Sequence, residues 1–166
     1  NSIQEFTVAP ILDVEDAVAR FNAQTGESVD GLDEMISRLH FVGDVGEFDD
    51  ITNTLIALRR AGVDGFEEME EAAFGALNTA KSQGVDAVAT FNGMNVLVRQ
   101  GLVGSWTEAA DVITAGLQNG NDRAGDMLQT LVQFGPMFAE MGLNAEQAMS
   151  LFSSGLDAGF RSTSDV

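Results

Sequence analysis

Glycines at a long, regular spacing are the feature that most constrains how this chain folds. Gly26, Gly62, Gly101 and Gly142 are 36, 39 and 41 residues apart. Each follows a segment in which apolar residues recur at helical spacing. Glycine is the usual residue just past a helix end, because it enters the left-handed conformation without a Cβ clash. An interval of about 40 residues is typical of helical-hairpin repeats, whereas strands bring turn signals roughly every 8–12 residues.

A second helix with one shared apolar pattern follows each of the last three glycines. The spacing i, i+3, i+7, i+11 places every set on a single helix face, which predicts that the face is buried. The three sets are Phe66, Met69, Ala73, Leu77; Trp106, Ala109, Ile113, Leu117; and Ala145, Ala148, Phe152, Leu156. Leu32, Met35 and Leu39 form a degenerate first copy of the same pattern.

Helix-start signals lie just before or at the beginning of these apolar sets. The stretches 105–108 (SWTE) and 144–147 (NAEQ) fit a capping box, in which two side chains reciprocally satisfy unpaired backbone N–H groups. The stretch 64–67 (DGFE) is a weaker version of the same device. The order glycine, cap, amphipathic helix therefore repeats along the chain.

The two prolines predict interruptions of this pattern. Pro10 predicts that residues 1–12 form an extended or loosely ordered lead-in. Gly135-Pro136 predicts a split in the helix that begins at about Asp126, with Pro136 starting a final short turn.

The fold class predicted from these signals is all-α. We expect short glycine-punctuated helical hairpins stacked as a small α-solenoid or an irregular helical bundle, because one hairpin buries too little apolar surface alone. A single helical-repeat domain should span residues 13–166, with units at roughly 13–43, 44–80, 84–120 and 122–160. The chain begins at Asn1 rather than Met, and we interpret it as a fragment of a longer protein. The longest uncharged stretch, 127–139, is too short to span a bilayer.

The charge of the chain limits its partners. Its 26 acidic and 8 basic residues give a net charge of −18, distributed as −13 over residues 1–80 and −5 over residues 81–166. Such a field repels phosphate and disfavours non-specific nucleic-acid binding, which needs Lys and Arg to displace counterions. A basic partner surface and simple solubility are both compatible with it.

Each candidate for chemistry has a simpler structural interpretation. His40 is the only histidine, so no histidine pair for zinc exists, and no Ser-His-Asp triad is recognisable around it. Asp44, Glu47, Asp49 and Asp50 invite a calcium interpretation, but their spacing does not fit an EF-hand. Asp49 and Asp50 stand where a helix N-terminus is expected, and acidic residues there complement the helix dipole.

The other candidates also point to structure rather than catalysis. The acidic run Glu67, Glu68, Glu70 and Glu71 fits an exposed helix face, without the Glu-x-x-His of a diiron site. The glycine pairs at 62–65 and 101–104 lack the strand and Lys-Ser/Thr of a phosphate loop. Phe91 and Trp106 are expected in the core. The absence of cysteine excludes disulfides and thiolate zinc sites. The sequence thus predicts no catalytic, cofactor-binding or metal-binding residue, no cofactor, and a protein that is not an enzyme.

Residues 84–166 resemble the tail tape measure proteins of long-tailed phages and prophages, and the likeness extends to about Phe48. Several glycine-punctuated units in order, at this spacing, carry the resemblance. They are the stretch 109–113 (AADVI) with Gly116 and Gly120, the stretch 126–131 (DMLQTL), Phe134 and Phe138, the stretch 141–148 (MGLNAEQA), and the stretch 157–159 (DAG) before 162–165 (STSD).

The resemblance implies a structural, non-catalytic role. Proteins of this family set tail length by templating the polymerisation of the tail tube around them, occupy its lumen and leave ahead of the DNA. The chain would then lie inside the tail tube of the virion, and in the host cytoplasm during assembly. Implied partners are the tail tube protein, tail assembly chaperones and tail-tip proteins. Self-association is also expected, and nucleic-acid binding is not.

The long ruler helix of this family is not visible in the chain, because glycines interrupt it too often for one long rod. We therefore expect a folded helical segment of the tape measure rather than the ruler itself. The alternative interpretation is an acidic α-helical protein-interaction module without catalytic activity.

Overall fold

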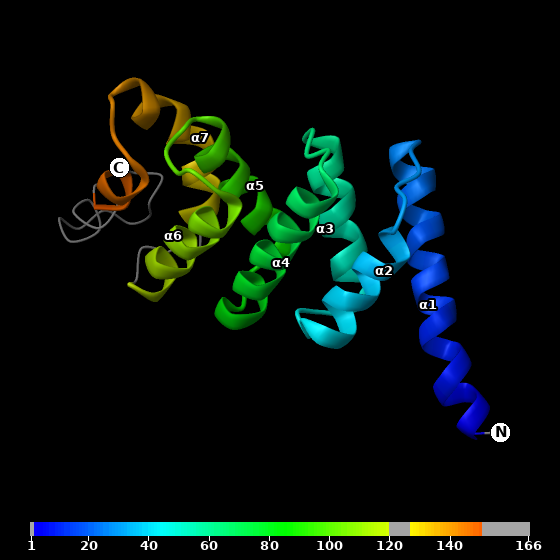
Figure 1. Ribbon diagram of the computed structural model, residues 1–166. Coiled ribbons are helices and arrows are strands. Elements are labelled where there is room, and N and C mark those ends of the chain that lie inside the picture. Colours follow the sequence, from blue (N-terminus) through cyan, green and yellow to red (C-terminus); the bar gives the residue numbers. More distant parts are fainter. Residues whose placement is uncertain (1, 120–126, 151–166) are drawn as a thin grey trace.

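The protein is a row of short helices that stack side by side (Figure 1). The structure, a computed structural model, describes residues 2–119 and 127–150, with side chains from residue 13 onward. Its elements are α1 (Ser2–Thr25), α2 (Leu32–Ser37), the π-helix η1 (Arg38–Val42), α3 (Phe48–Arg60), α4 (Phe66–Gln83), α5 (Ala87–Arg99), α6 (Trp106–Gln118) and α7 (Met127–Glu140). Residues 145–150 are also helical, and no strand occurs in these described ranges. The predicted all-α class is confirmed.

Each helix packs mainly against its near neighbours in the chain. Helix α3 contacts α1 and α4, α4 contacts α5 and α6, and α5 contacts α7. Helix α1 therefore lies at one end of the row and α7 at the other (Figure 1). One continuous apolar core runs through the row, from Val14 in α1 to Met149. Contacts limited to neighbouring units are typical of helical-repeat proteins.

The first element differs from the prediction made for it. We expected residues 1–12 to be an extended lead-in, but α1 begins at Ser2 and continues to Thr25. Pro10 lacks one N–H donor, yet the rest of the helix still gains one hydrogen bond for each residue added. Val14, Ala17 and Phe21 are buried against the next elements, so the second half of α1 is anchored by packing.

The predicted helix ends are confirmed. Gly26, Gly62, Gly101 and Gly142 all have positive φ angles, between 70° and 93°. Gly84, which the spacing did not single out, ends α4 in the same left-handed conformation. The chain direction therefore reverses at glycine after α1, α3, α4, α5 and α7.

Two of the three predicted caps are present. Asn144 and Gln147 exchange two hydrogen bonds of 2.9 Å, as the capping box requires. Ser105 accepts from the N–H of Glu108, while the Glu108 carboxylate accepts from Gly104 N–H, one residue before the cap. The third prediction was wrong. Gly65 is the N-cap of α4, and it makes no side-chain cap.

The predicted split at Gly135-Pro136 was also wrong. Helix α7 runs from Met127 to Glu140 with Pro136 inside it. Apolar residues are buried on both sides of the proline, with Leu131 fully buried before it and Phe138 4% exposed after it. Packing of this face outweighs the loss of one backbone hydrogen bond.

The predicted apolar stripes face the core. Met69, Ala73, Leu77, Ala109, Ile113, Ala145 and Ala148 are buried, as are Leu32, Met35 and Leu39 of the first copy and Trp106. Phe66 and Leu117 are half-buried and pack against this core. Phe152 and Leu156 lie outside the described residues, as do residue 120 of the third predicted unit and residues 122–126 and 151–160 of the fourth.

A candidate interaction surface

Basic side chains join neighbouring units of the stack. All six basic residues in the described ranges bond to a group 32 to 38 residues away in sequence. The pairs are Arg20 with Asn53, Arg38 with Glu70, Arg59 with Glu27, Arg60 with Gln24, Lys81 with Asp44, and Arg99 with the carbonyl of Ala61. The separation is close to the repeat length, so these residues act as bridges between units.

Arg59 makes the most extensive of these bridges. Its Nε donates to Glu27 at 2.6 Å, and its Nη1 donates to the carbonyl of Asp64 at 3.0 Å. Its side chain is 16% exposed. The hydrogen bond to Glu27 raises the pKa of Arg59, and the bond to Glu70 likewise raises the pKa of Arg38. Both guanidinium groups therefore stay charged over the whole working pH range.

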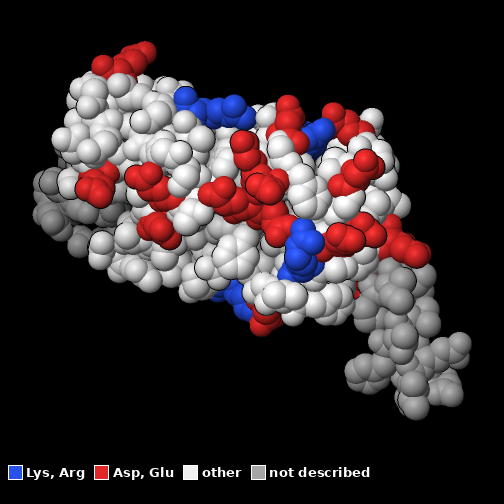
Figure 2. Space-filling model, viewed as in Figure 1, with Lys and Arg blue, Asp and Glu red and all other residues white. Residues whose placement is uncertain are grey.

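The surface left by this arrangement is acidic. Figure 2 shows acidic side chains spread over one face of the stack and basic side chains in isolated groups. The described basic groups are paired with other groups of the same chain. The excess carboxylates therefore give the surface a negative electrostatic potential. Such a surface repels the phosphates of nucleic acids.

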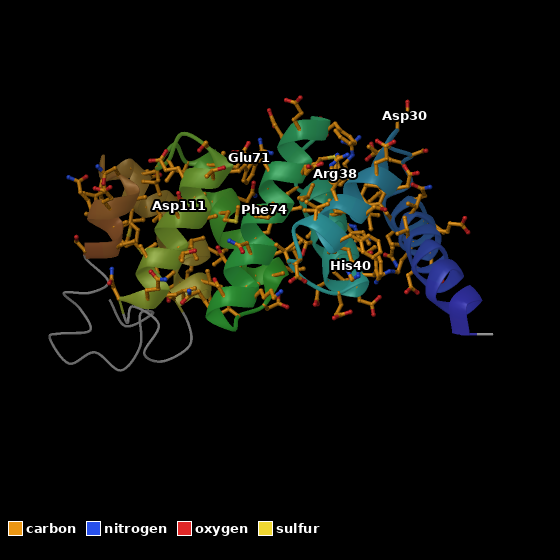
Figure 3. The ribbon with its side chains drawn as sticks, turned by 60° about the horizontal axis from the view of Figure 1, so that its bottom comes forward. Asp30, Arg38, His40, Glu71, Phe74 and Asp111 are labelled. Atoms are coloured by element: carbon orange, nitrogen blue, oxygen red, sulfur yellow. The ribbon has the colours of Figure 1, made fainter. Side chains whose placement is uncertain are left out.

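An apolar groove lies between η1 and α4, and we call it the η1–α4 groove. Its volume is about 430 Å³. Leu39 is buried at 2% exposure, whereas Val42 and Phe74 are 81% and 43% exposed. The groove is lined by Arg38, Leu39, Val42, Gly43, Glu67, Glu70, Glu71 and Phe74. Figure 3 labels Arg38, Glu71 and Phe74 on this part of the molecule.

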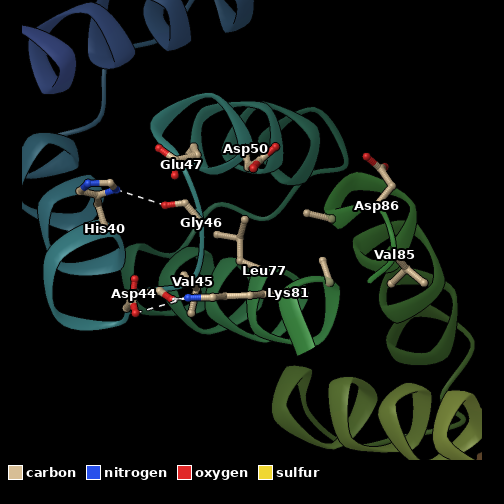
Figure 4. Close-up of a pocket in the computed structure, with 12 residues that line it drawn as sticks. His40, Asp44, Val45, Gly46, Glu47, Asp50, Leu77, Lys81, Val85 and Asp86 are labelled. Atoms are coloured by element: carbon tan, nitrogen blue, oxygen red, sulfur yellow. Dashed lines mark hydrogen bonds and ion pairs between the residues drawn. The ribbon is translucent and has the colours of Figure 1, made fainter. Parts of the chain in front are cut away.

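A second hollow, of about 340 Å³, lies beside His40 (Figure 4). His40 Nδ1 is 3.1 Å from the carbonyl oxygen of Gly46, and its ring stacks on Phe48 with 3.9 Å between centroids. Lys81 Nζ bridges to Asp44 at 3.3 Å. His40 and Lys81 are thus engaged in contacts that hold the loop before α3.

The acidic cluster considered for calcium is dispersed over this loop and the next helix. Asp49 and Asp50 lie in the first turn of α3, as predicted, but Glu47 at the N-cap accepts no side-chain cap bond. Within the described ranges no group of three His, Cys, Asp or Glu residues is placed to hold a metal ion.

The remaining predicted candidates lie at structural positions. Phe91 and Trp106 are stacked in the core, with 5.6 Å between ring centroids. Glu67 and Glu68 occupy the first turn of α4. Gly62 and Gly101 end helices rather than holding phosphate.

The η1–α4 groove was missed by the sequence reasoning. Phe74 follows Ala73 and falls off the buried stripe of α4, which is the signal that would have identified it. Val42 could not be found this way. It is exposed because the chain forms a π-helix there, closed by a hydrogen bond from Gly43 N–H to the carbonyl of Arg38.

The fold and surface together define an acidic stacked-helix protein. In its described ranges, no helix is long and apolar enough to cross a membrane. A family model described as phage-related minor tail protein matches residues 45–166. The chain therefore belongs to the phage-related minor tail protein family, and it is a component of the phage tail and hence of the virion. No curated protein and no solved structure matches the chain.

Proposed function

We propose that this chain is a folded helical segment of a tail tape measure protein, which sets tail length and occupies the tail tube. Membership of the phage tail family carries the proposal, together with the glycine-punctuated resemblance described above. The segment acts without catalysis, and it contacts the tail tube protein, tail assembly chaperones and tail-tip proteins.

The dimensions of the helices support a folded body rather than a ruler. The longest helix whose side chains are all described, α4, has 18 residues, which span only about 27 Å at 1.5 Å per residue. Stacking places successive helices beside one another instead of end to end (Figure 1). The length-setting part of the parent protein would be an uninterrupted helical region outside this stack.

The acidic surface supports a position in the tube lumen. DNA passes through the tube when the phage infects, and a negative surface whose described basic groups are paired within the chain does not retain a phosphate backbone. Arg20, Arg59 and Arg99 bond to groups of the chain itself. The carboxylates that outnumber the basic groups therefore determine the charge of the surface.

Tail length tests the tape measure role. In the phage that carries this gene, shortening an uninterrupted helical region of the parent protein should shorten the tail by about 1.5 Å per residue removed. Deleting the α5–α6 hairpin should reduce the number of tails but leave the length of assembled tails unchanged. Electron micrographs of purified tails measure both quantities. Tails of normal length after the first deletion would contradict the proposal.

Chemical labelling tests the position in the lumen. The natural chain has no cysteine, so Ser28→Cys at an exposed position introduces a single reactive thiol. A maleimide carried on a bulky polymer should label this thiol rapidly in the isolated chain and slowly in intact tails. Labelling should become rapid again when tails are dissociated. Equally fast labelling in intact tails would place the segment on the outside.

A further inference from the structure

The η1–α4 groove is built by an irregularity of the backbone. The chain passes from α2 directly into the π-helix Arg38–Val42, whose wider turn ends at Gly43. A π-turn adds one residue to a helical turn and changes which side chains face outward, and such turns are frequent at functional sites. Here Leu39 stays in the core while Val42 is left 81% exposed.

The opposite wall of the groove comes from α4. The Phe74 ring lies over Gly43, where an added Cβ would be 3.4 Å from its Cε2 atom. Phe74 keeps 43% of its surface exposed, although an aromatic ring of this size gains most from full burial. Val42 and Phe74 therefore form an apolar pair that nothing in the described part of the chain covers fully.

Charged side chains surround this apolar pair. Glu67, Glu70 and Glu71 come from one face of α4, because residues three and four apart are neighbours on a helix. Arg38 is the single basic residue of the lining, and its Nε donates to Glu70 at 3.2 Å. Three acids against one base give the lining a net charge of −2.

This chemistry selects one class of occupant. An apolar floor with charged flanks is the arrangement that receives an amphipathic helix, whose apolar side chains enter the groove. The negative rim favours lysine and arginine beside that apolar face. Phosphate head groups and nucleic acids would be repelled. A second copy of this chain would bring its own charge of −18 to the same surface.

We propose that the η1–α4 groove is a docking site for a basic amphipathic helix of another protein. The helix places apolar side chains against Val42 and Phe74, and a lysine or arginine side chain pairs with Glu67. Glu70 already pairs with Arg38, and Glu71 accepts hydrogen bonds from Thr107, so Glu67 is the lining carboxylate without such a contact in the described chain. Glu67 is exposed and is available for such pairing. This docking role is independent of tail-length control.

A titration of the ¹⁵N-labelled 166-residue chain tests the proposal. The probe is a synthetic helical peptide of about four turns (~14 residues) with leucine along one face and lysine along the other. The control peptide has the same composition in an order that gives no apolar face. We expect the probe to shift the amide resonances of η1 and of residues 67–74, and the control peptide to bind at least about tenfold more weakly.

Substitutions at the apolar pair separate specific docking from charge attraction. Val42→Ser and Phe74→Ser should each weaken probe binding about tenfold, because a large apolar contact is lost. Val132→Ser on α7 is the matched control, since Val132 is 41% exposed at the far end of the stack, and binding should change less than about twofold. Val42 is so exposed that its replacement leaves the core intact.

A charge-reversal pair provides the second control. Glu67→Lys should weaken binding about fivefold at low salt, while Asp111→Lys, on exposed α6 surface (Figure 3), should change it less than about twofold. Equal effects of the two reversals, or shifts spread over the whole acidic face, would overturn the proposal. Absence of probe binding would also overturn it. A self-associated state in light scattering that Phe74→Ser dissociates would identify a second copy as the occupant instead.

Discussion

The helices of the N-terminal half are joined by charged bridges, whereas those of the C-terminal half approach one another at glycines. Helices α1, α2 and α3 and the π-helix η1 contain no glycine, and α4, α5, α6 and α7 contain one each. These four glycines, Gly75, Gly93, Gly116 and Gly135, are all buried. Glycine inside a helix lowers stability by about 0.5–1 kcal/mol relative to alanine. Close packing between helices explains why glycine stands at these four positions.

The contacts at these glycines are tight. A Cβ on Gly75 would be 3.0 Å from the Cβ of Ala110 in α6, and one on Gly93 would be 3.2 Å from Ile113. A Cβ on Gly135 in α7 would overlap Cγ1 of Val96 in α5. The C-terminal helices therefore gain stability from close apolar contact, which salt does not screen.

Helix caps also divide the chain, one helix later, between α4 and α5. The helices α2, α3 and α4 have no side-chain cap, although acidic residues lie in the first turn of each. In contrast, Asp86 caps α5 at 2.8 Å, Ser105 caps α6, and Asn144 caps the helix at 145–150. One apolar core runs through both halves, but the early helices begin with charged first turns, whereas the later ones begin with side-chain caps and meet at glycines.

The largest expected effect is at the tightest glycine contact. Gly135→Ala should lower the free energy of unfolding by about 1–2 kcal/mol, because overpacking costs more than alanine gains in helix propensity. Urea unfolding followed by circular dichroism measures the change. The double variant Val96→Ala with Gly135→Ala should be more stable than the sum of the single changes predicts. A stabilised Gly135→Ala protein would show that α5 and α7 do not meet closely.

The caps provide the next test of the division. Ser105→Ala removes the acceptor of the Glu108 N–H and should cost about 1 kcal/mol. Glu47→Ala, at an N-cap without a side-chain bond, should cost less than about 0.5 kcal/mol. The same urea titration compares the two variants. Equal losses would mean that the two halves do not differ in how their helices begin.

The smallest expected effect concerns a charged bridge. Arg59→Ala should lower the free energy of unfolding by about 0.5–1 kcal/mol in dilute buffer, because it removes the bonds to Glu27 and Asp64. In about 1 M NaCl the loss of unfolding free energy caused by Arg59→Ala should shrink, because salt screens the ion pair. The loss caused by Gly135→Ala should persist. Arg59→Lys, which keeps the charge, should lose less than Arg59→Ala. Identical salt responses of the glycine and arginine variants would remove the distinction between the halves.

Much of the secondary structure was predictable because its signals are local. The positive φ of Gly62 and Gly101 and the caps at Ser105 and Asn144 depend on a few adjacent residues. The failure at Pro136 has a tertiary cause. Sequence rules count the hydrogen bond that Pro136 removes, but they do not include the burial of Leu131 and Phe138 on either side of it.

The groove was beyond such rules for a related reason. Phe74 falls off the buried stripe of α4, but the π-helix that places Gly43 beneath its ring and forms the other wall of the groove has no strong local signature. Asp64 illustrates the opposite error. Its position before a helix predicted a cap. Instead, its carbonyl accepts a hydrogen bond from Arg59, and its carboxylate forms an ion pair with the same guanidinium group.

The sequence by itself determined the helices, the glycines that end them, the length of the repeating unit and the negative charge, because these follow from backbone conformation, periodicity and composition. Only the tertiary structure decided which groups meet across that repeat. Arg59 finds Glu27 at a separation of 32 residues, and Gly135 meets Val96 at a helix crossing. Such partners depend on how helices stack in space, and stacking is set by the summed burial of many side chains rather than by any local pattern.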